Sequence, residues 1–165
     1  MRVIGLAGWS GAGKTTLLRR LIPVLVGQGL RVSTVKHAHH LFDVDQPGKD
    51  SWEHRHAGAT EVLISSANRW AVMHELRGAP EPSLPELLGR LSKVDLVLVE
   101  GFKRGTHRKI EVHRAANGKP PLYPDDPSIV AIATDAPPLG ALPQVHLDDV
   151  AGMAALVQAH AEALA

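Results

Sequence analysis

A glycine-rich stretch near the start of the chain, GLAGWSGAGKTT at residues 5–16, constrains the possible fold more than any other segment. Gly8 is followed by four residues and then by Gly13, Lys14 and Thr15, which is the full spacing of a P-loop. Glycines leave the backbone free to curl so that several N–H groups point inward, and such a concave set of donors suits an anion with several oxygens. The sequence therefore predicts a phosphate-binding loop.

The segments on both sides of this loop fit the order of strand, loop and helix that the motif requires. Residues 2–7 form an almost continuous apolar run, which is typical of a parallel strand covered on both faces. The apolar residues after the loop follow a helical spacing: Leu18, Leu21, Ile22 and Leu25. A helix that begins there points its free N–H groups at the phosphate. In this arrangement Lys14 reaches the β- and γ-phosphates, and the Thr15 hydroxyl is a ligand of Mg²⁺.

A second acidic ligand for Mg²⁺ is expected at the end of a neighbouring strand, because parallel strands bring their carboxyl ends to one edge of the sheet. Residues 96–99 are apolar, and Glu100 and Gly101 follow them directly. We therefore predict that Glu100 lies on the metal side of the nucleotide, and a surface glutamate at a strand end is the alternative. Three further acids are candidates for an outer-shell metal contact or for positioning water: Asp43, Asp45 and Asp50.

Guanine recognition usually depends on a carboxylate that accepts hydrogen bonds from ring N1 and the exocyclic amine together. Residues 92–95, SKVD, superficially resemble a guanine-reading pattern, but they precede the acidic strand and so belong to the opposite end of the sheet. Asp135 ends the strand-like run SIVAIATD, at the same edge as the P-loop. We predict that Asp135 reads the base, and an ordinary turn-forming aspartate is the alternative.

The remaining segments alternate between strand-like and helix-like patterns, which predicts an α/β protein of the P-loop NTPase fold, with a mainly parallel, twisted sheet and helices on both faces. EVLISS at residues 61–66 and WAVMHEL at residues 70–76 are expected to pair as an added hairpin. A short helix is expected around residues 51–57, and Pro23 is expected to kink the helix after the loop. The predicted apolar stripe of the last helix consists of Val150, Met153, Ala154, Val157, Ala161 and Leu164.

Composition limits the function classes that are open to the chain. Its 165 residues are 44% hydrophobic and 21% charged, which is ordinary for a globular protein, so residues 1–165 are expected to form a single domain. The sequence has no cysteine, which excludes a disulfide framework and a thiolate zinc site. A net charge of +1 and 4% aromatic residues argue against nucleic-acid binding. Without a signal-peptide pattern or an apolar run that crosses a bilayer, a cytoplasmic location is expected.

Three stretches carry a family resemblance together: the P-loop GWSGAGKTT, the stretch VKHAHHLFDVDQPGKDSWEHRHAGA at residues 35–59, and VEGFK at residues 99–103. The run AIATD at residues 131–135 supports them. Together they resemble the molybdopterin-guanine dinucleotide biosynthesis adapter proteins, the MobB family. The resemblance extends from Val3 to about Asp135. Its central stretch, with PGKDS and AGA around a histidine-rich turn, is far more specific than a P-loop alone.

This resemblance implies a GTP-binding protein of P-loop α/β fold that hydrolyses GTP weakly at most. It implies a homodimer in which strands extend the sheet between subunits, and an adapter that assists the guanylyltransferase joining GMP to molybdopterin. Either GTP or the molybdopterin cofactor is then what the adapter brings to its partner. Glu100 lies on the Mg²⁺ side, and the residues that hold the nucleotide phosphates are Gly8, Ser10, Gly11, Ala12, Gly13, Lys14, Thr15 and Thr16. Like the family, the chain lacks the usual GTPase guanine motif.

Ten histidines are present, and several of them follow the second strand: His37, His39, His40, His54 and His56. Imidazole suits zinc and other transition metals, but no spacing here matches a defined metal site. Solvated histidines, or histidines directed at a phosphate, are therefore preferred over a metal site.

A local group of basic residues follows the acidic strand: Lys103, Arg104, Arg108, Lys109 and Arg114. Because the whole chain is nearly neutral, this local excess of positive charge suits an anionic partner surface or the phosphate of a pterin cofactor. A solvated hairpin is an equal alternative.

A second function class also fits the loop, because GxSGxGKTT occurs in small-molecule kinases that resemble uridine kinase. Such an enzyme needs a base for the acceptor hydroxyl, for which Asp45 or Asp50 is the candidate catalytic residue. It also usually needs an arginine-bearing lid, and the proline-rich residues 77–90 do not contain a basic cluster. The adapter is therefore the preferred interpretation, and the kinase is its alternative.

Overall fold

The computed structural model describes residues 1–38, 42–102 and 105–163. The chain divides into two compact units, which we name the sheet unit (Met1–His37 and Leu84–Ala165) and the hairpin unit (Ala38–Ser83). Two compact units can belong to one domain, so the expectation of a single domain over residues 1–165 stays a prediction.

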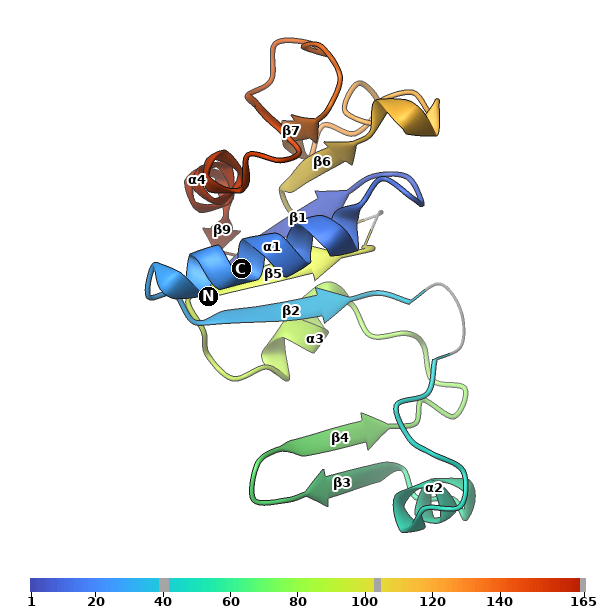
Figure 1. The fold of residues 1–165 in the computed structure, drawn as a ribbon. Helices are drawn as coiled ribbons and strands as arrows, with labels where there is room; N and C mark the ends of the chain where they lie inside the picture. The colour runs from blue at the N-terminus through green and yellow to red at the C-terminus, as the bar shows by residue number, and fades with distance from the viewer. Residues whose placement is uncertain (39–41, 103–104, 164–165) are drawn as a thin grey trace. The chain divides into compact units, whose positions relative to one another are not determined.

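Seven strands form one sheet within the described part of the sheet unit (Figure 1). They are β1 (Arg2–Ala7), β2 (Val32–Lys36), β5 (Leu96–Glu100), β6 (Lys109–His113), β7 (Ile129–Thr134), β8 (Gln144–His146) and β9 (Glu162–Ala163). The strand order is β2-β5-β1-β6-β7-β8, and every pair along it is parallel. The short β9 pairs antiparallel with β1. The prediction of a mainly parallel sheet is confirmed.

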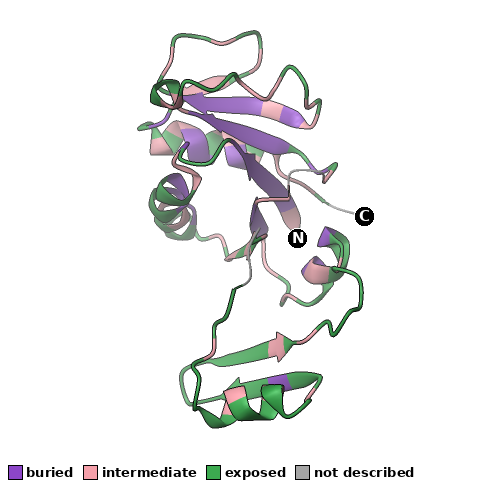
Figure 2. Cartoon of the chain, turned by 90° about the vertical axis from the view of Figure 1, so that its right-hand side faces the viewer, coloured by how far each residue is buried: buried purple, intermediate pink, exposed green. Residues whose placement is uncertain are grey.

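Helices cover both faces of this sheet: α1 (Lys14–Gly27), α3 (Leu84–Gly89) and α4 (Val150–His160). Successive residues of a strand point to opposite faces, so Ile4 packs in one core with residues of α1 and α4, whereas Val3 packs in a second core with residues of α3. Most of the strand residues are fully buried, as Figure 2 shows. This double covering explains why residues 2–7 and 96–99 are continuous apolar runs.

β6 is the exception, because one of its faces is polar and buried. Ile110 and Val112 belong to the core under α1 and α4. On the other face Lys109, Glu111 and His113 are only 3%, 0% and 8% exposed. Each of them has hydrogen-bond partners in the chain that follows β6, as buried polar groups require.

The hairpin unit contains α2 (Asp50–His56), β3 (Glu61–Ser65) and β4 (Trp70–His74). β3 and β4 pair antiparallel in a sheet of their own, which confirms the predicted hairpin. Inside this unit, Arg55 forms ion pairs with Asp43 at 2.7 Å, Glu75 at 3.0 Å and Asp45 at 3.6 Å. One guanidinium therefore holds the chain before α2 and the chain after β4 together.

The last helix is shorter than its apolar stripe predicts. α4 ends at His160, the backbone of Ala161 is extended, and β9 follows, so the predicted helical place of Ala161 is wrong, while Leu164 lies outside the described residues. The physical reason is a free edge: β6 pairs with β1 only from Gly5 onward, which leaves Arg2 and Val3 open to β9.

Pro23 lies inside α1, which continues to Gly27, and the expected kink stays a prediction. In the described part of the chain, every helix falls short of the length or apolarity that spanning a membrane requires.

Candidate functional site

The P-loop joins β1 to α1 at the carboxyl edge of the sheet. Gly8 has a φ of 147°, and a Cβ at this position would lie 2.5 Å from the carbonyl oxygen of Val112 on β6, so the loop leaves the strand where no larger residue fits. The Lys14 ammonium donates hydrogen bonds to the carbonyl oxygens of Gly8 at 2.8 Å and Trp9 at 3.0 Å. Lys14 is the first residue of α1, and its ammonium group is held against the loop by these two hydrogen bonds. The backbone N–H groups of the first turn of α1 lack intrahelical partners.

The two predicted metal ligands lie side by side. In the parallel pairing of β1 and β5, Leu6 is opposite Glu100, so the acid reaches the same edge as the P-loop. The Thr15 hydroxyl donates to Oε1 of Glu100 at 3.2 Å, and Nζ of Lys36 lies 3.8 Å from Oε2. Glu100 is only 9% exposed. A hydroxyl and a carboxylate next to a phosphate loop are the oxygen ligands that Mg²⁺ takes in nucleotide sites, so the residues fit that ion.

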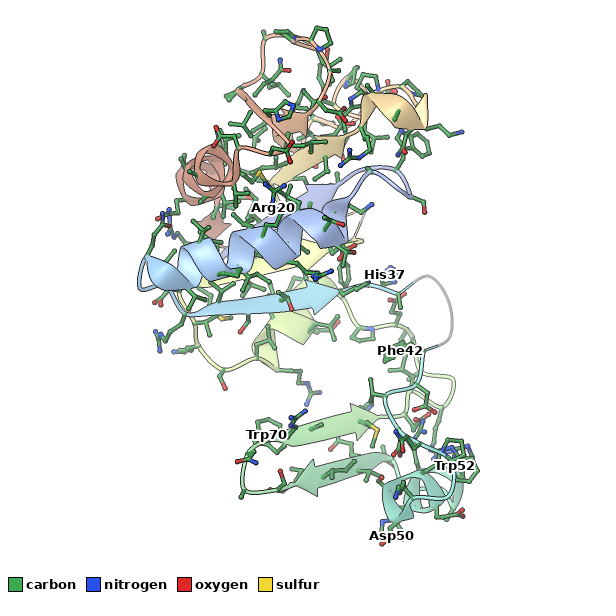
Figure 3. The ribbon with its side chains drawn as sticks, in the orientation of Figure 1. Arg20, His37, Phe42, Asp50, Trp52 and Trp70 are labelled. Carbon is green, nitrogen blue, oxygen red and sulfur yellow. The ribbon has the colours of Figure 1, made fainter. Side chains whose placement is uncertain are left out.

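The chain turns sharply after Glu100. Gly101 has a φ of 100°, and a Cβ there would lie 2.7 Å from the carbonyl oxygen of His37. His37 directly follows β2 (Figure 3), and it donates its backbone N–H to the carbonyl oxygen of Glu100 at 2.8 Å. A larger residue than glycine at position 101 would separate the ends of β2 and β5, and with them the carboxylate.

The segment after β6 packs on the P-loop, which the sequence did not predict. The indole N–H of Trp9 donates to the carbonyl oxygen of Pro120 at 2.8 Å, and the side-chain amide of Asn117 donates to the carbonyl oxygen of Ser10 at 3.2 Å. Asn117 ends a short 3-10 helix, η1 (Ala115–Asn117). We name residues 114–120 the strap. These contacts join residues more than 100 positions apart in the sequence, and no local pattern signals them.

Asp135, the predicted base reader, directly follows β7 at the carboxyl edge. Its Oδ1 accepts the backbone N–H of Ala115 at 2.7 Å, and its Oδ2 lies 3.3 Å from a guanidinium nitrogen of Arg114. The carboxylate therefore lies against the strap. Its role in base recognition stays a prediction.

Asp95 lies at the opposite end of the sheet, directly before β5, as predicted from its place in the sequence. It accepts hydrogen bonds from the guanidinium and from the backbone N–H of Arg31, which hold the pKa of the Asp95 carboxyl below its usual value. Asp95 therefore pairs with Arg31 at the edge of the sheet opposite the P-loop.

The other predicted acids belong to the hairpin unit. Asp45 pairs with Arg55 and accepts the Ser51 hydroxyl at 2.9 Å, and Asp50 begins α2 (Figure 3). The hydrogen bond from Arg55 holds the pKa of Asp43 below its usual value. The ion pairs of Asp43 and Asp45 give these residues a structural role, and the catalytic or metal roles of Asp43, Asp45 and Asp50 stay predictions.

The histidines and basic residues are dispersed. Within the described ranges, three His, Cys, Asp or Glu side chains never gather into a metal-binding group, and His39 and His40 lie outside those ranges. Lys103 and Arg104 also lie outside them.

β6 pairs parallel with β1 and β7, so the solvated-hairpin interpretation of the basic residues is wrong. Arg108 pairs with Glu162 at 2.9 Å. Lys109 is buried and therefore adds nothing to a basic surface.

Comparisons with known proteins agree with this geometry. The family model for molybdopterin guanine dinucleotide synthesis protein B, MobB, matches residues 3–135. The chain is 43% identical over 158 residues to the molybdopterin-guanine dinucleotide biosynthesis adapter protein of Escherichia coli, covering 94% of this chain and 90% of the relative. It is 45% identical over 138 residues to the protein of the same name from Haemophilus influenzae, covering 82% and 75%.

Solved structures give the same result for the fold. A crystal structure of molybdopterin-guanine biosynthesis protein B superposes with a TM-score of 0.76 at 28% identity, covering 95% of this chain and 98% of the other. The crystal structure of Bacillus subtilis MobB superposes with a TM-score of 0.75 at 22% identity, covering 99% and 100%, which supports the fold alone.

Proposed function

The chain belongs to the MobB family, and from this premise we propose that it is a GTP-binding adapter in the biosynthesis of molybdopterin guanine dinucleotide. The relatives that match along most of its length are named as adapters of this pathway. The kinase interpretation has no such support. Hydrolysis of GTP is weak at most in this proposal, because an adapter acts by delivery or by a change of conformation.

One observation carries the nucleotide part of the proposal: the P-loop lysine and the pair formed by Thr15 and Glu100 meet at one edge of the sheet. When GTP binds, Lys14 exchanges its contacts to the loop carbonyls for phosphate oxygens, and the loop N–H groups and α1 complete the cradle. Thr15 and Glu100 hold Mg²⁺, which neutralises phosphate charge. Ser10 and Thr16 belong to the same cradle.

For the base, we propose that guanine is recognised by Asp135. Its carboxylate is held at the carboxyl edge by one hydrogen bond from Ala115 to Oδ1 and one from Arg114 to Oδ2, and a carboxylate oxygen has the capacity to accept a second one. Arg114 also lies near the loop, 3.2 Å from the position that a Cβ on Gly13 would take.

The partner in this proposal is the guanylyltransferase that joins GMP to molybdopterin, and the adapter works as a homodimer. The hairpin unit supports the dimer because several large apolar side chains are exposed on it: Leu63, Ile64, Trp70, Val72 and Leu76. Three of them, Leu63, Trp70 and Val72, share one face of the hairpin, and exposed apolar patches are typical of interaction surfaces.

Isothermal titration calorimetry with GTP and with ATP, both in Mg²⁺, tests the nucleotide site. We expect the native chain to bind GTP in preference to ATP, and Lys14→Ala to lose binding while its circular dichroism spectrum stays native, because Lys14 acts on phosphate and not in the core. Lys93→Ala is the matched control, since Lys93 is an exposed lysine two residues before Asp95, at the opposite edge of the sheet. Unchanged GTP affinity in Lys14→Ala would remove the assignment of the site, and a preference for ATP would favour the kinase.

A further inference from the structure

An open cavity of about 660 Å³ lies beside the P-loop strand. It is lined by Ala7, the last residue of β1, by Lys109, the first residue of β6, and by the segment Asp125 to Ser128. This volume lies within the range of about 300–1,000 Å³ that is usual for small-molecule sites. The cavity is therefore large enough for a ligand of its own.

The cavity adjoins the phosphate-binding loop. A second, much smaller cavity of about 20 Å³ shares Ala7 and Lys109 with the first and is also lined by Gly8, Lys14 and His107. His107 is only 3% exposed, and its Nδ1 is without a hydrogen-bond partner in the described residues. The large cavity thus adjoins the P-loop through Ala7 and Lys109, and the unsatisfied atom of His107 belongs to the small cavity between them.

The charged side chains that line the large cavity disfavour the binding of a phosphate group there. Lys109 uses its three N–H donors on the Gly105 carbonyl at 2.6 Å, the Ser128 hydroxyl at 2.6 Å and the Asp126 carboxylate at 3.2 Å. Asp126 therefore neutralises the only cation in the lining described for the cavity. Asp125 remains as an exposed carboxylate for which the described residues supply no side-chain partner. The surplus is one negative charge, which repels phosphate and attracts N–H donors.

We propose that this cavity binds the 2-amino-4-oxopyrimidine ring of a pterin while the nucleotide occupies the P-loop. The ring N–H and the amino group are parallel donors that match the two oxygens of Asp125, and the apolar side chains of Leu122 and Pro127 offer contact to the ring faces. The proposal rests on the proposed function, whose relatives are named for a pterin compound. It adds a place for the ring within this chain.

The test is a titration of the full chain with the fluorescent compound 6-hydroxymethylpterin, first alone and then with a non-hydrolysable GTP analogue and Mg²⁺ at saturation. We expect saturable binding of one pterin per chain in both conditions. Asp125→Asn should weaken pterin binding about tenfold or more, because a carboxylate that accepts two hydrogen bonds is lost. Leu122→Trp should block the cavity. Asp148→Asn, a substitution outside the cavity lining, should change nothing.

Guanine presents the same donor edge as a pterin, so the nucleotide arm distinguishes the two sources. If the GTP analogue displaces the pterin competitively, the ring enters the nucleotide site and the proposal is overturned. It is also overturned if binding does not saturate, or if both cavity variants bind pterin as the native chain does while their GTP affinity shows that they are folded. Pterin binding without any GTP binding would leave the cavity assignment intact and remove the proposed function.

Discussion

We expect Glu100 to determine how strongly GTP binding depends on Mg²⁺. Its carboxylate is nearly buried and lies 3.2 Å from the Thr15 hydroxyl, so a metal bound there replaces an existing hydrogen bond with two oxygen ligands. Glu100→Gln keeps the size of the side chain and removes the charge. We expect GTP affinity in Mg²⁺ to fall about tenfold or more and affinity in EDTA to change little.

Calorimetry in the two buffers checks this prediction for Glu100→Gln. Asp95→Asn is the control, because it removes a carboxylate from the opposite edge of the sheet. Equal losses with and without Mg²⁺ would assign Glu100 a purely structural role.

His107 predicts a pH dependence of stability. Burial, together with the charge of Lys109, holds the pKa of His107 below its usual value of 6.5, against smaller opposing effects of Glu162 and Asp126. As the pH falls through 6.5, the unfolded chain takes up a proton that the folded chain refuses, so this contribution to the free energy of unfolding is complete above pH 6.5 and is lost below it.

Urea unfolding at about pH 7.5 and about pH 5.5 tests the role of His107, with His107→Gln as the comparison. The variant should lose less stability than the native chain between the two values. An identical loss in both would show that other groups cause the pH dependence.

At the residue scale, the site residues that could be predicted are those in a local motif or directly after a strand. Lys14 and Thr15 belong to a local motif, and Glu100 follows an apolar run that can only be a central strand. Asn117 and His107 gave no such signal, because their partners on the P-loop and β1 come from distant parts of the chain. The order of the parallel strands in the sheet brings these residues close to their partners, and that order could not be predicted from the sequence alone.

Among the elements, β6 depends most on polar contacts. Both oxygens of Glu111, which is fully buried, accept backbone N–H groups: Leu122 at 2.7 Å and Tyr123 at 2.9 Å. Glu111→Gln offers one acceptor and places an amide donor against the other N–H. We expect a loss of about 1.5–3 kcal/mol in the free energy of unfolding, measured in urea. Glu53→Gln on the exposed face of α2 is the control, and a loss of the same size there would contradict the assignment.

The end of α4 shows that a local sequence pattern does not always predict where an element ends. The apolar spacing at the end of the chain fits a helix through Ala161, yet the backbone leaves the helix there because β1 offers an unpaired edge at Arg2 and Val3. Pairing with the free edge of β1 therefore outweighs the local helical spacing at Ala161, and the sequence alone does not show that this edge is free. The hairpin of β3 and β4, by contrast, was predicted because both of its strands and its turn are local.

For the whole molecule, the hairpin unit carries the proposed dimer. In the register of its two strands Leu63 is opposite Val72, and Trp70 lies two residues from Val72, so these three side chains share one face of the hairpin. Trp70, at the start of β4, is labelled in Figure 3. Leu63, Val72 and Trp70 are 63%, 45% and 65% exposed, respectively. Val62 lies on the other face and is buried. The middle of this face is therefore apolar and exposed within the described chain, beside the ion pair of Glu61 and His74.

The double variant Trp70→Asp and Val72→Asp tests this face. If a second copy covers it, the native chain sediments as a dimer at micromolar concentration and the variant as a monomer, because two buried carboxylates at a symmetric contact cost far more than the contact supplies. GTP affinity should stay unchanged, since the P-loop belongs to the sheet unit. Ala71→Asp is the control, because Ala71 is exposed and lies on the other face of the same hairpin, opposite Ile64. A native chain that sediments as a monomer, or a variant that remains a dimer, would place the subunit contact elsewhere or remove it.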